Sequence, residues 1–202
     1  MRPRSFSRTF AKEHRSITQA VLLEEIVFRI QATNNIRDGK RWFYDPLDEL
    51  QKKLPFLKRT AIDDAAKNLV AKGFLEIGNY NHAKYDQTRW YHVPEEHWAA
   101  VDDQKVWFQE ADAVAHGIPA ALLMYNLDYQ LAQKFERNDG ETHAMSPTDL
   151  ATRLPMSKST IKATLTDLAK KGVLVKVEGK RSEYAFAPDR MREIQTRVEM
   201  NR

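Results

Sequence analysis

The side chains with the clearest chemistry in this sequence are lysines and short hydroxyls between residues 157 and 171. Within this stretch Ile161, Leu165 and Leu168 recur at helical spacing, so they predict one buried helix face. The opposite face is then exposed, and its ammonium and hydroxyl groups can bond phosphates or base edges. We therefore expect an anion-binding face, or simply a solvated one, formed by Lys158, Ser159, Thr160, Lys162 and Thr166.

A related stretch in the first half carries a different balance of charge. Lys58, Arg59, Thr60 and Lys67 could bind an anion, but Asp63 and Asp64 share their predicted helix face. Two adjacent carboxylates repel phosphates, although they can accept hydrogen bonds from cytosine amino groups. Two polar segments that follow the predicted helices carry further cations, and we expect these to bind DNA or, in the first half, a protein: Lys84 and Arg89, and Lys180 and Arg181.

The usual catalytic and cofactor-binding patterns are absent from the sequence. The 202 residues include no cysteine, and the six histidines form no helical pair that could share a metal ion. Neither a P-loop nor a dinucleotide-binding glycine pattern occurs. We therefore expect a non-enzymatic protein without metal or cofactor. The lack of cysteine suits a reducing cytoplasm, and the lack of about 18 consecutive apolar residues argues against a membrane span.

An internal repeat supplies the elements that would position these side chains. The apolar residues of 20–30 recur in the same order at 121–131, which predicts one amphipathic helix twice. Asp45 and Ser146, each followed by proline, predict the start of a second helix, with Asp48 and Asp149 placed to complete capping boxes.

A third helix and a hairpin follow in both copies. Leu-Pro pairs at 54–55 and 154–155 predict a tight turn, and Gly73 and Gly172 predict the end of the third helix. Apolar runs at 74–77 and 173–177 then precede a polar turn and the segments 90–93 and 184–186. Short strands are expected at 42–44 and 143–145. The order predicts a mainly α protein with small β-hairpins (α+β), built from two tandem winged helix-turn-helix domains.

Charge distribution suggests the domain boundaries. Residues 1–16 hold five basic residues against one acidic residue, and 94–116 hold six acidic residues against one basic residue. We expect a basic N-terminal arm at 1–16, winged helix domains at 17–93 and 117–187, an acidic helical connector at 94–116, and a C-terminal tail at 188–202. The arm could neutralise phosphates through Arg2, Arg4 and Arg8, or remain a solvated tail.

Several short motifs in the first half carry a family resemblance. They are Ala20-Val21-Leu22-Leu23, Arg41-Trp42-Phe43-Tyr44, Leu54-Pro55-Phe56, Ala71-Lys72-Gly73-Phe74-Leu75, Gly78-Asn79-Tyr80-Asn81 and residues 85–91. Together they resemble the winged-helix segment of phage and plasmid replication initiators and replisome organisers. The resemblance covers 17–93 well and 117–187 only at the level of the fold. One departure is Lys58, which stands where such segments usually place a serine-type helix cap.

The resemblance implies sequence-specific binding to double-stranded DNA, with a role in replication initiation at origin repeats of a phage, plasmid or other mobile element. Such a role implies recruitment of a helicase or other replication proteins, because the sequence has no helicase motif. A homodimer is compatible with the role of a replication initiator. A transcriptional regulator of the same fold and a protein-protein adaptor built from winged helices are the alternatives.

Overall fold

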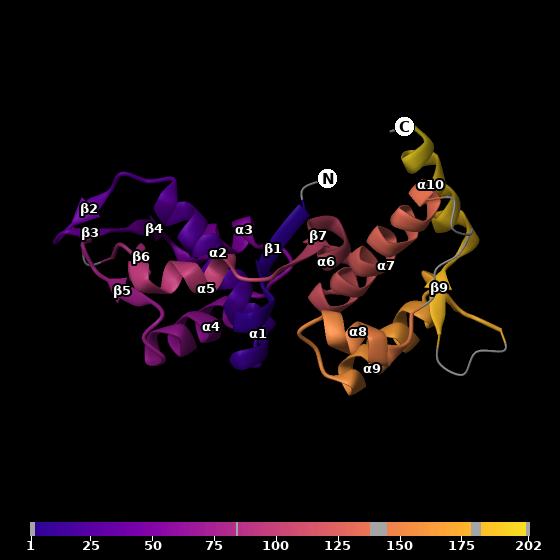
Figure 1. The fold of residues 1–202 in the computed structure, drawn as a ribbon. Helices are drawn as coiled ribbons and strands as arrows, with labels where there is room; N and C mark the ends of the chain where they lie inside the picture. The colour runs from indigo at the N-terminus through magenta and orange to yellow at the C-terminus, as the bar shows by residue number, and fades with distance from the viewer. Residues whose placement is uncertain (1–2, 84, 138–144, 179–182, 201–202) are drawn as a thin grey trace. The chain divides into compact units, whose positions relative to one another are not determined.

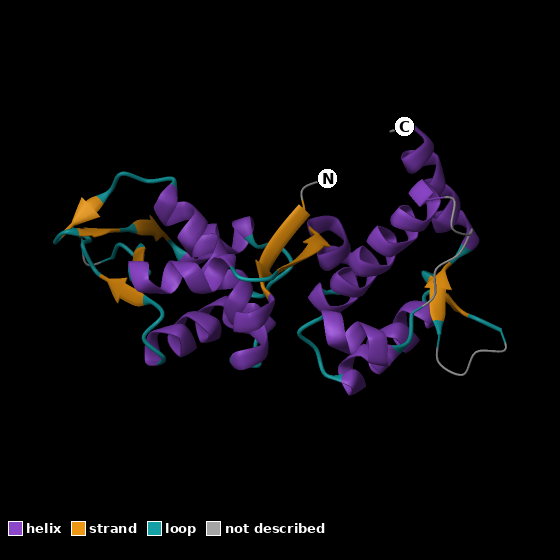
Figure 2. Ribbon diagram, viewed as in Figure 1, coloured by secondary structure: helices purple, strands orange, loops and turns teal. Residues whose placement is uncertain are grey.

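A computed structural model describes residues 3–83, 85–137, 145–178 and 183–200 of the chain. These residues form mainly helices together with small sheets, as Figure 1 and Figure 2 show. The mainly α prediction with small β-hairpins is thus confirmed. The chain divides into two compact units, which we call the N-terminal unit (Ser5–Val106) and the C-terminal unit (Trp107–Arg202 with Met1–Arg4).

The helices of the N-terminal unit are built around α2 (Ile17–Gln31), whose cap Ser16 accepts a hydrogen bond from the Gln19 backbone N–H. Its apolar face, which includes Leu22 and Ile26, is fully buried and packs against α4. The remaining helices are α1 (Arg8–Glu13), α3 (Leu47–Lys53), α4 (Arg59–Ala71), α5 (Trp98–Asp102) and a 3-10 turn at Glu95–His97.

The N-terminal unit also holds a three-stranded antiparallel sheet in the order β4 (Phe43–Asp45), β6 (Arg89–His92), β5 (Glu76–Gly78). A separate hairpin joins β2 (Ile36–Arg37) to β3 (Lys40–Arg41). Its two turn residues, Asp38 and Gly39, both have positive φ, at 50° and 73°. Asp-Gly is a favoured pair for such a two-residue turn because it tolerates the left-handed backbone.

The N-terminal segment differs from the free arm expected from the sequence. β1 (Pro3–Ser7) pairs with β7 (Lys105–Gln109), and α1 follows directly. Phe6 and Phe10 are buried, and the Phe10 ring meets Phe74 edge-on with 5.0 Å between centroids. The segment is therefore held by burial of two phenylalanines together with the strand pairing, neither of which its charge reveals.

The C-terminal unit is arranged around α7 (Ile118–Arg137), which packs against α6, α9 and α10. β8 and β9 form an antiparallel hairpin, and Met145 bridges to Tyr184 where the sequence predicts a short strand. Residues 143 and 144 of that strand lie outside the described residues. The other elements are α6 (Glu110–His116), α8 (Pro147–Arg153), α9 (Lys158–Lys170), β8 (Leu174–Lys176), β9 (Tyr184–Phe186) and α10 (Pro188–Met200).

The structure adds detail to the expected connector and tail. Helices α5 and α6 lie within the expected helical connector of 94–116, but residues 105–109 between them form strand β7, consistent with the β-forming residues Val106, Trp107 and Phe108. Residues 188–200 of the expected tail form helix α10, which buries Ile194 and Val198 and packs on α7.

The expected capping boxes form in only one half of the chain. Ser146 caps α8, and Asp149 accepts a hydrogen bond from the Ser146 backbone N–H in return. At α3 the cap position is taken by Pro46, which has no side-chain acceptor, so no side chain caps the helix; the Asp45 carboxylate pairs with Lys53 at 2.7 Å and Asp48 pairs with Arg59. The acidic residues predicted to cap this helix are therefore engaged in ion pairs.

Candidate nucleic-acid interface

The exposed face of α9 is fixed by burial on its other side. Ile161, Leu165 and Leu168 are fully buried, which confirms the core face predicted from their spacing. The helix begins at Ser157, whose Oγ accepts a hydrogen bond of 3.1 Å from the Thr160 backbone N–H. This cap holds the first turn of α9 in a defined orientation.

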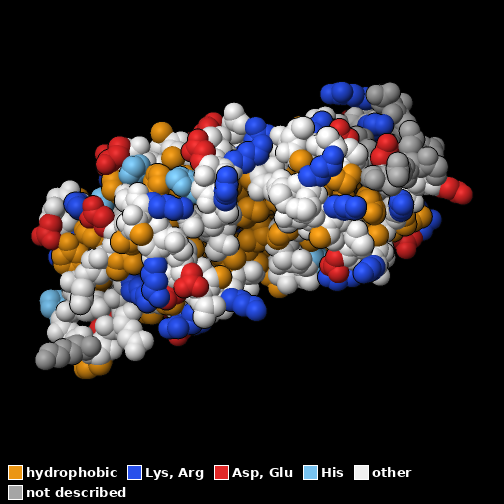
Figure 3. Space-filling model, turned by 90° about the horizontal axis from the view of Figure 1, so that it is seen from below, with side chains coloured by type: hydrophobic (Ala, Val, Ile, Leu, Met, Phe, Trp, Pro, Cys, Tyr) orange, Lys and Arg blue, Asp and Glu red, His pale blue; other side chains and the backbone are white. Residues whose placement is uncertain are grey.

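The predicted anion-binding side chains all lie on the exposed side of α9. Lys158, Ser159, Thr160, Lys162 and Thr166 are exposed to solvent. In the described part of the chain, neither Lys158 nor Lys162 has an ion-pair partner, whereas Lys171 at the end of the helix pairs with Asp167 at 2.7 Å. Figure 3 shows Lys and Arg side chains spread over the visible surface of the C-terminal unit.

All three predicted hydroxyls already have partners in α9 or at its cap. Thr166 donates to the Lys162 carbonyl at 2.9 Å, and the Ser159 and Thr160 hydroxyls each lie 2.8 Å from the Ser157 Oγ. The lysines therefore have the greater freedom to meet an outside anion. Four other predicted contacts fall outside the described residues: Arg2, Lys84, Lys180 and Arg181.

The corresponding face of α4 in the N-terminal unit is largely self-neutralised. Arg59 pairs with Asp48 at 2.5 Å, while Lys67 and Arg89 both pair with Asp63, at 2.7 and 2.6 Å. Hydrogen bonds from Lys67 and Arg89 lower the pKa of Asp63 to about 2, so this carboxylate is ionised at neutral pH. Three of the cations predicted to bind DNA thus bind carboxylates of the same unit.

This pairing changes the expectation that Asp63 and Asp64 act together as repulsive charges. Asp63 is offset by two cations, and Asp64 remains exposed on the helix. Lys58 and Thr60 are also exposed at the start of α4, and Lys58 makes no side-chain cap hydrogen bond there. Acidic and basic side chains are interleaved on the visible surface of the N-terminal unit (Figure 3).

The arginines of the N-terminal segment are similarly engaged. The Arg4 Nε lies 2.7 Å from Glu110, and Arg8 donates to the Gln104 side-chain oxygen at 2.6 Å. Both contacts are made beside the ends of the β1–β7 pair. These arginines are held by the fold, unlike the side chains of the free arm expected from the sequence.

An ordered aromatic cluster that the sequence did not predict lies on the sheet of the N-terminal unit. Tyr44 and Trp90 are register partners on β4 and β6, and their ring centroids are 4.7 Å apart. Tyr80 meets the same Trp90 ring edge-on at 5.2 Å. Alternation along 42–44 and 90–92 predicts which side chains of one strand share a face, but not which residues of the two strands lie opposite one another.

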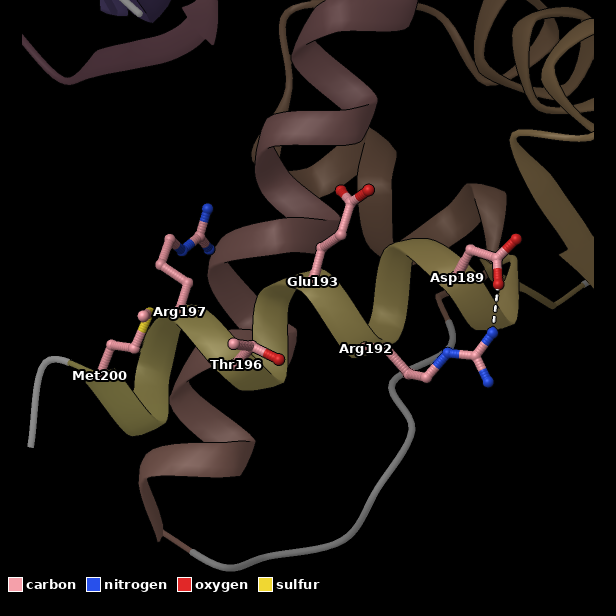
Figure 4. A pocket seen from close by; sticks show the side chains of 6 residues that line it. All are labelled: Asp189, Arg192, Glu193, Thr196, Arg197 and Met200. Atoms are coloured by element: carbon pink, nitrogen blue, oxygen red, sulfur yellow. Dashed lines mark hydrogen bonds and ion pairs between the residues drawn. The ribbon is translucent and has the colours of Figure 1, made fainter.

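A surface hollow lies beside α10, and the described residues that line it come from that helix. Their side chains point to different sides of the helix, and Arg192 pairs with Asp189 (Figure 4). Arg197 instead pairs with Asp128 of α7. The lining therefore does not converge on a point where a substrate would be held. Its residues are Asp189, Arg192, Glu193, Thr196, Arg197 and Met200.

The described residues contain no group of three or more His, Asp or Glu side chains suited to hold a metal ion. Over the same residues, no helix has both the length and the apolar character required to cross a bilayer. No protein-family model matches the chain, and a search of curated proteins finds no match.

Proposed function

We propose that the chain binds double-stranded DNA sequence-specifically through two winged helix-turn-helix modules and acts as a replication initiator at origin repeats of a phage, plasmid or other mobile element. The order of elements supports this proposal. In the N-terminal unit, α2, β4, α3, α4 and the β5–β6 hairpin follow one another. In the C-terminal unit, α7, the Met145 bridge, α8, α9 and the β8–β9 hairpin repeat this order.

The observation that carries the proposal is the exposed first half of α9. In a helix-turn-helix, the N-terminal residues of the recognition helix contact base edges in the major groove. Lys158 and Lys162 are exposed there without ion pairs among the described residues. Their ammonium groups can replace the counterions of DNA phosphates, while Ser159 lies beside them and can reach a base edge.

The replication role rests on the resemblance of residues 17–93 to initiator proteins, and it carries the expectation that a helicase or another replication protein is recruited. A transcriptional regulator would engage a groove in the same way. Binding to origin repeats combined with a loss of replication in binding-deficient variants supports an initiator, whereas intact replication with altered transcription supports a regulator.

The direct test is a binding titration on duplexes that contain the repeats of the element's own origin. Lys158→Ala with Lys162→Ala should weaken binding severalfold or more. The slope of log affinity against log salt should fall by about 0.9 for each phosphate that the variant no longer binds. The matched control is Lys170→Ala with Lys171→Ala, which removes the same charge from the other end of α9.

The comparison between the two double variants decides the result. If both weaken binding equally, the lysines contribute only general charge and α9 does not enter the groove. If neither variant changes affinity or the salt slope, this helix does not bind DNA. Circular dichroism verifies that both variants remain folded.

A protein-protein adaptor is a second candidate for the N-terminal unit alone. The observation in its favour is the neutralised face of α4, where Asp48 and Asp63 hold Arg59, Lys67 and Arg89. Replacing Asp63 and Asp64 with Asn should raise nonspecific DNA affinity if α4 approaches DNA. Unchanged DNA affinity with an altered association state in sedimentation would instead indicate a protein contact.

A further inference from the structure

The aromatic cluster of the N-terminal unit is centred on the indole of Trp90. Tyr44 lies against this ring at 4.7 Å between centroids with an interplanar angle of 31°. The Arg37 guanidinium carbon lies 5.9 Å from the centroid of the same ring. A tyrosine from β4 and an arginine from β2 are therefore brought together around one indole.

The polar groups of the cluster hold the rings in place. The Trp90 indole N–H donates to the Asn81 side-chain oxygen at 2.8 Å, and the Trp42 indole N–H donates to the Arg37 carbonyl at 3.2 Å. The Tyr80 hydroxyl donates to Asp38 at 2.7 Å. These bonds join the β2–β3 hairpin to Trp42 and Tyr80, and join Asn81 to β6.

Close packing at Gly78 further fixes the arrangement. A Cβ at this position would lie 3.0 Å from atoms of both Trp42 and Tyr80, so a larger residue would push the rings apart. The backbone of β5 approaches the aromatic rings at this point because Gly78 has no side chain. The cluster is thus ordered before any ligand arrives, which lowers the entropic cost of binding.

Tyr44 differs from the other rings of the cluster in its exposure. Trp42 and Trp90 retain 4% and 8% of their accessible surface, whereas Tyr44 retains 50%. A half-exposed ring that rests against an indole retains surface on which another ring can stack. Aromatic side chains of this kind stack on nucleic-acid bases.

The charges near the cluster are mixed, and Arg37 is a cation among them that an anionic ligand could reach. Arg37 is exposed and has no ion-pair partner in the described parts of the chain, while Lys40 is paired with Glu76 at 2.6 Å. The Asp38 carboxylate at the hairpin turn accepts a hydrogen bond from the Tyr80 hydroxyl. The Arg37 guanidinium, whose carbon lies 5.9 Å from the centroid of the Trp90 ring, is therefore a group of the cluster that can bind a phosphate.

We propose that this face of the N-terminal unit binds single-stranded nucleic acid, with one base stacked on Tyr44 and an adjacent phosphate held by Arg37. A single strand fits better than a duplex because its bases expose their faces, whereas duplex bases cover one another. The site lies on the sheet and is separate from the α9 face of the C-terminal unit. It extends the proposed function and does not depend on it.

The test measures binding of the full chain to a thymidine homopolymer, a uridine homopolymer and a duplex by fluorescence anisotropy. Tyr44→Ala should weaken single-strand binding about fivefold or more, from the loss of one base–aromatic stack. Tyr44→Phe should retain the affinity because the ring remains. Arg37→Ala should weaken binding and reduce the salt slope by about 0.7, the value for one phosphate on a single strand.

The matched control is Tyr129→Ala on α7, since Tyr129 is 52% exposed but is not part of the aromatic cluster. It should leave single-strand binding unchanged. Melting curves show whether Tyr44→Ala remains folded. Tyr44→Phe can be measured even if Tyr44→Ala does not fold. A preference for the thymidine over the uridine strand identifies the ligand as DNA, and the reverse identifies it as RNA.

Three outcomes would overturn the proposal: unchanged single-strand affinity in Tyr44→Ala, an equal loss in Tyr129→Ala, or an equal loss on single strand and duplex. Failure of the duplex-binding function is distinguishable. If the duplex-binding function is wrong, the double variant Lys158→Ala with Lys162→Ala will bind the duplex with unchanged affinity. This result does not depend on the single-strand affinity of the Tyr44 variants.

Discussion

Replacing Phe10 with alanine tests whether the N-terminal segment is part of the folded core. Phe10 lies in α1 and retains 3% of its accessible surface. Its ring meets Phe74 edge-on at 5.0 Å and His14 at 4.3 Å between centroids. The variant therefore removes an aromatic ring that joins α1 to the segment following α4.

The expected loss of stability follows from the size of the deleted group. Phenylalanine-to-alanine changes in a core cost about 3–5 kcal/mol, and α1 is a short helix at one end of the unit, so about 3 kcal/mol is expected. At about 4 °C per kcal/mol for a unit of this size, the melting temperature should fall by about 12 °C. Deleting residues 1–15 should cost more, because the buried Phe6 is removed as well.

Thermal unfolding of the full chain, followed by circular dichroism and tryptophan fluorescence, measures this change. Three tryptophans, Trp42, Trp90 and Trp98, lie in the N-terminal unit and report its unfolding. Phe28→Ala is the matched control, since Phe28 is 48% exposed on α2 and the same atoms are removed. It should lower stability by less than about 1 kcal/mol.

If Phe10→Ala melted within a degree or two of Phe28→Ala, the N-terminal segment would not be part of the folded core. The same holds if deletion of residues 1–15 left the melting temperature unchanged while DNA affinity fell. Either result would mean that the segment is a free arm, as its charge alone suggests.

Three other predictions concern stability. Asp63→Asn should lower the free energy of unfolding by about 1 kcal/mol at neutral pH. This is less than the full pKa shift of Asp63 implies, because solvent screens its pair with the exposed Lys67. The native pKa is lowered from 3.8 to about 2, so this stabilisation is present above pH 4 and lost towards pH 2. Urea unfolding of both proteins should therefore differ at pH 7 and converge at pH 2; a constant gap would contradict it. Ser157→Ala should cost about 1 kcal/mol through loss of the α9 cap, seen as a lower urea midpoint. Ile161→Asp should unfold the C-terminal unit, and an unchanged melt would mean that the core face is misassigned.

Local patterns in the sequence were sufficient to predict the repeated helices and their ends. Gly73 and Gly172 end α4 and α9 with positive φ of 80° and 73°, which follows from the freedom of glycine alone. The Ser157 cap and the buried Ile161 likewise depend on neighbours within one or two helical turns. Short-range physics of this kind is visible in a single sequence.

The partners of charged and aromatic side chains were decided only by the tertiary structure. Asp63 pairs with Arg89, which lies 26 residues away in the sequence, and the Phe10 ring contacts that of Phe74, which is also distant in the sequence. The charge of residues 1–16 predicts a free arm, because a count of charges takes no account of Phe6 and Phe10, which are buried among residues distant in the sequence. The same limit hid the stack of Tyr44 on Trp90, since cross-strand neighbours depend on a register that long-range pairing sets.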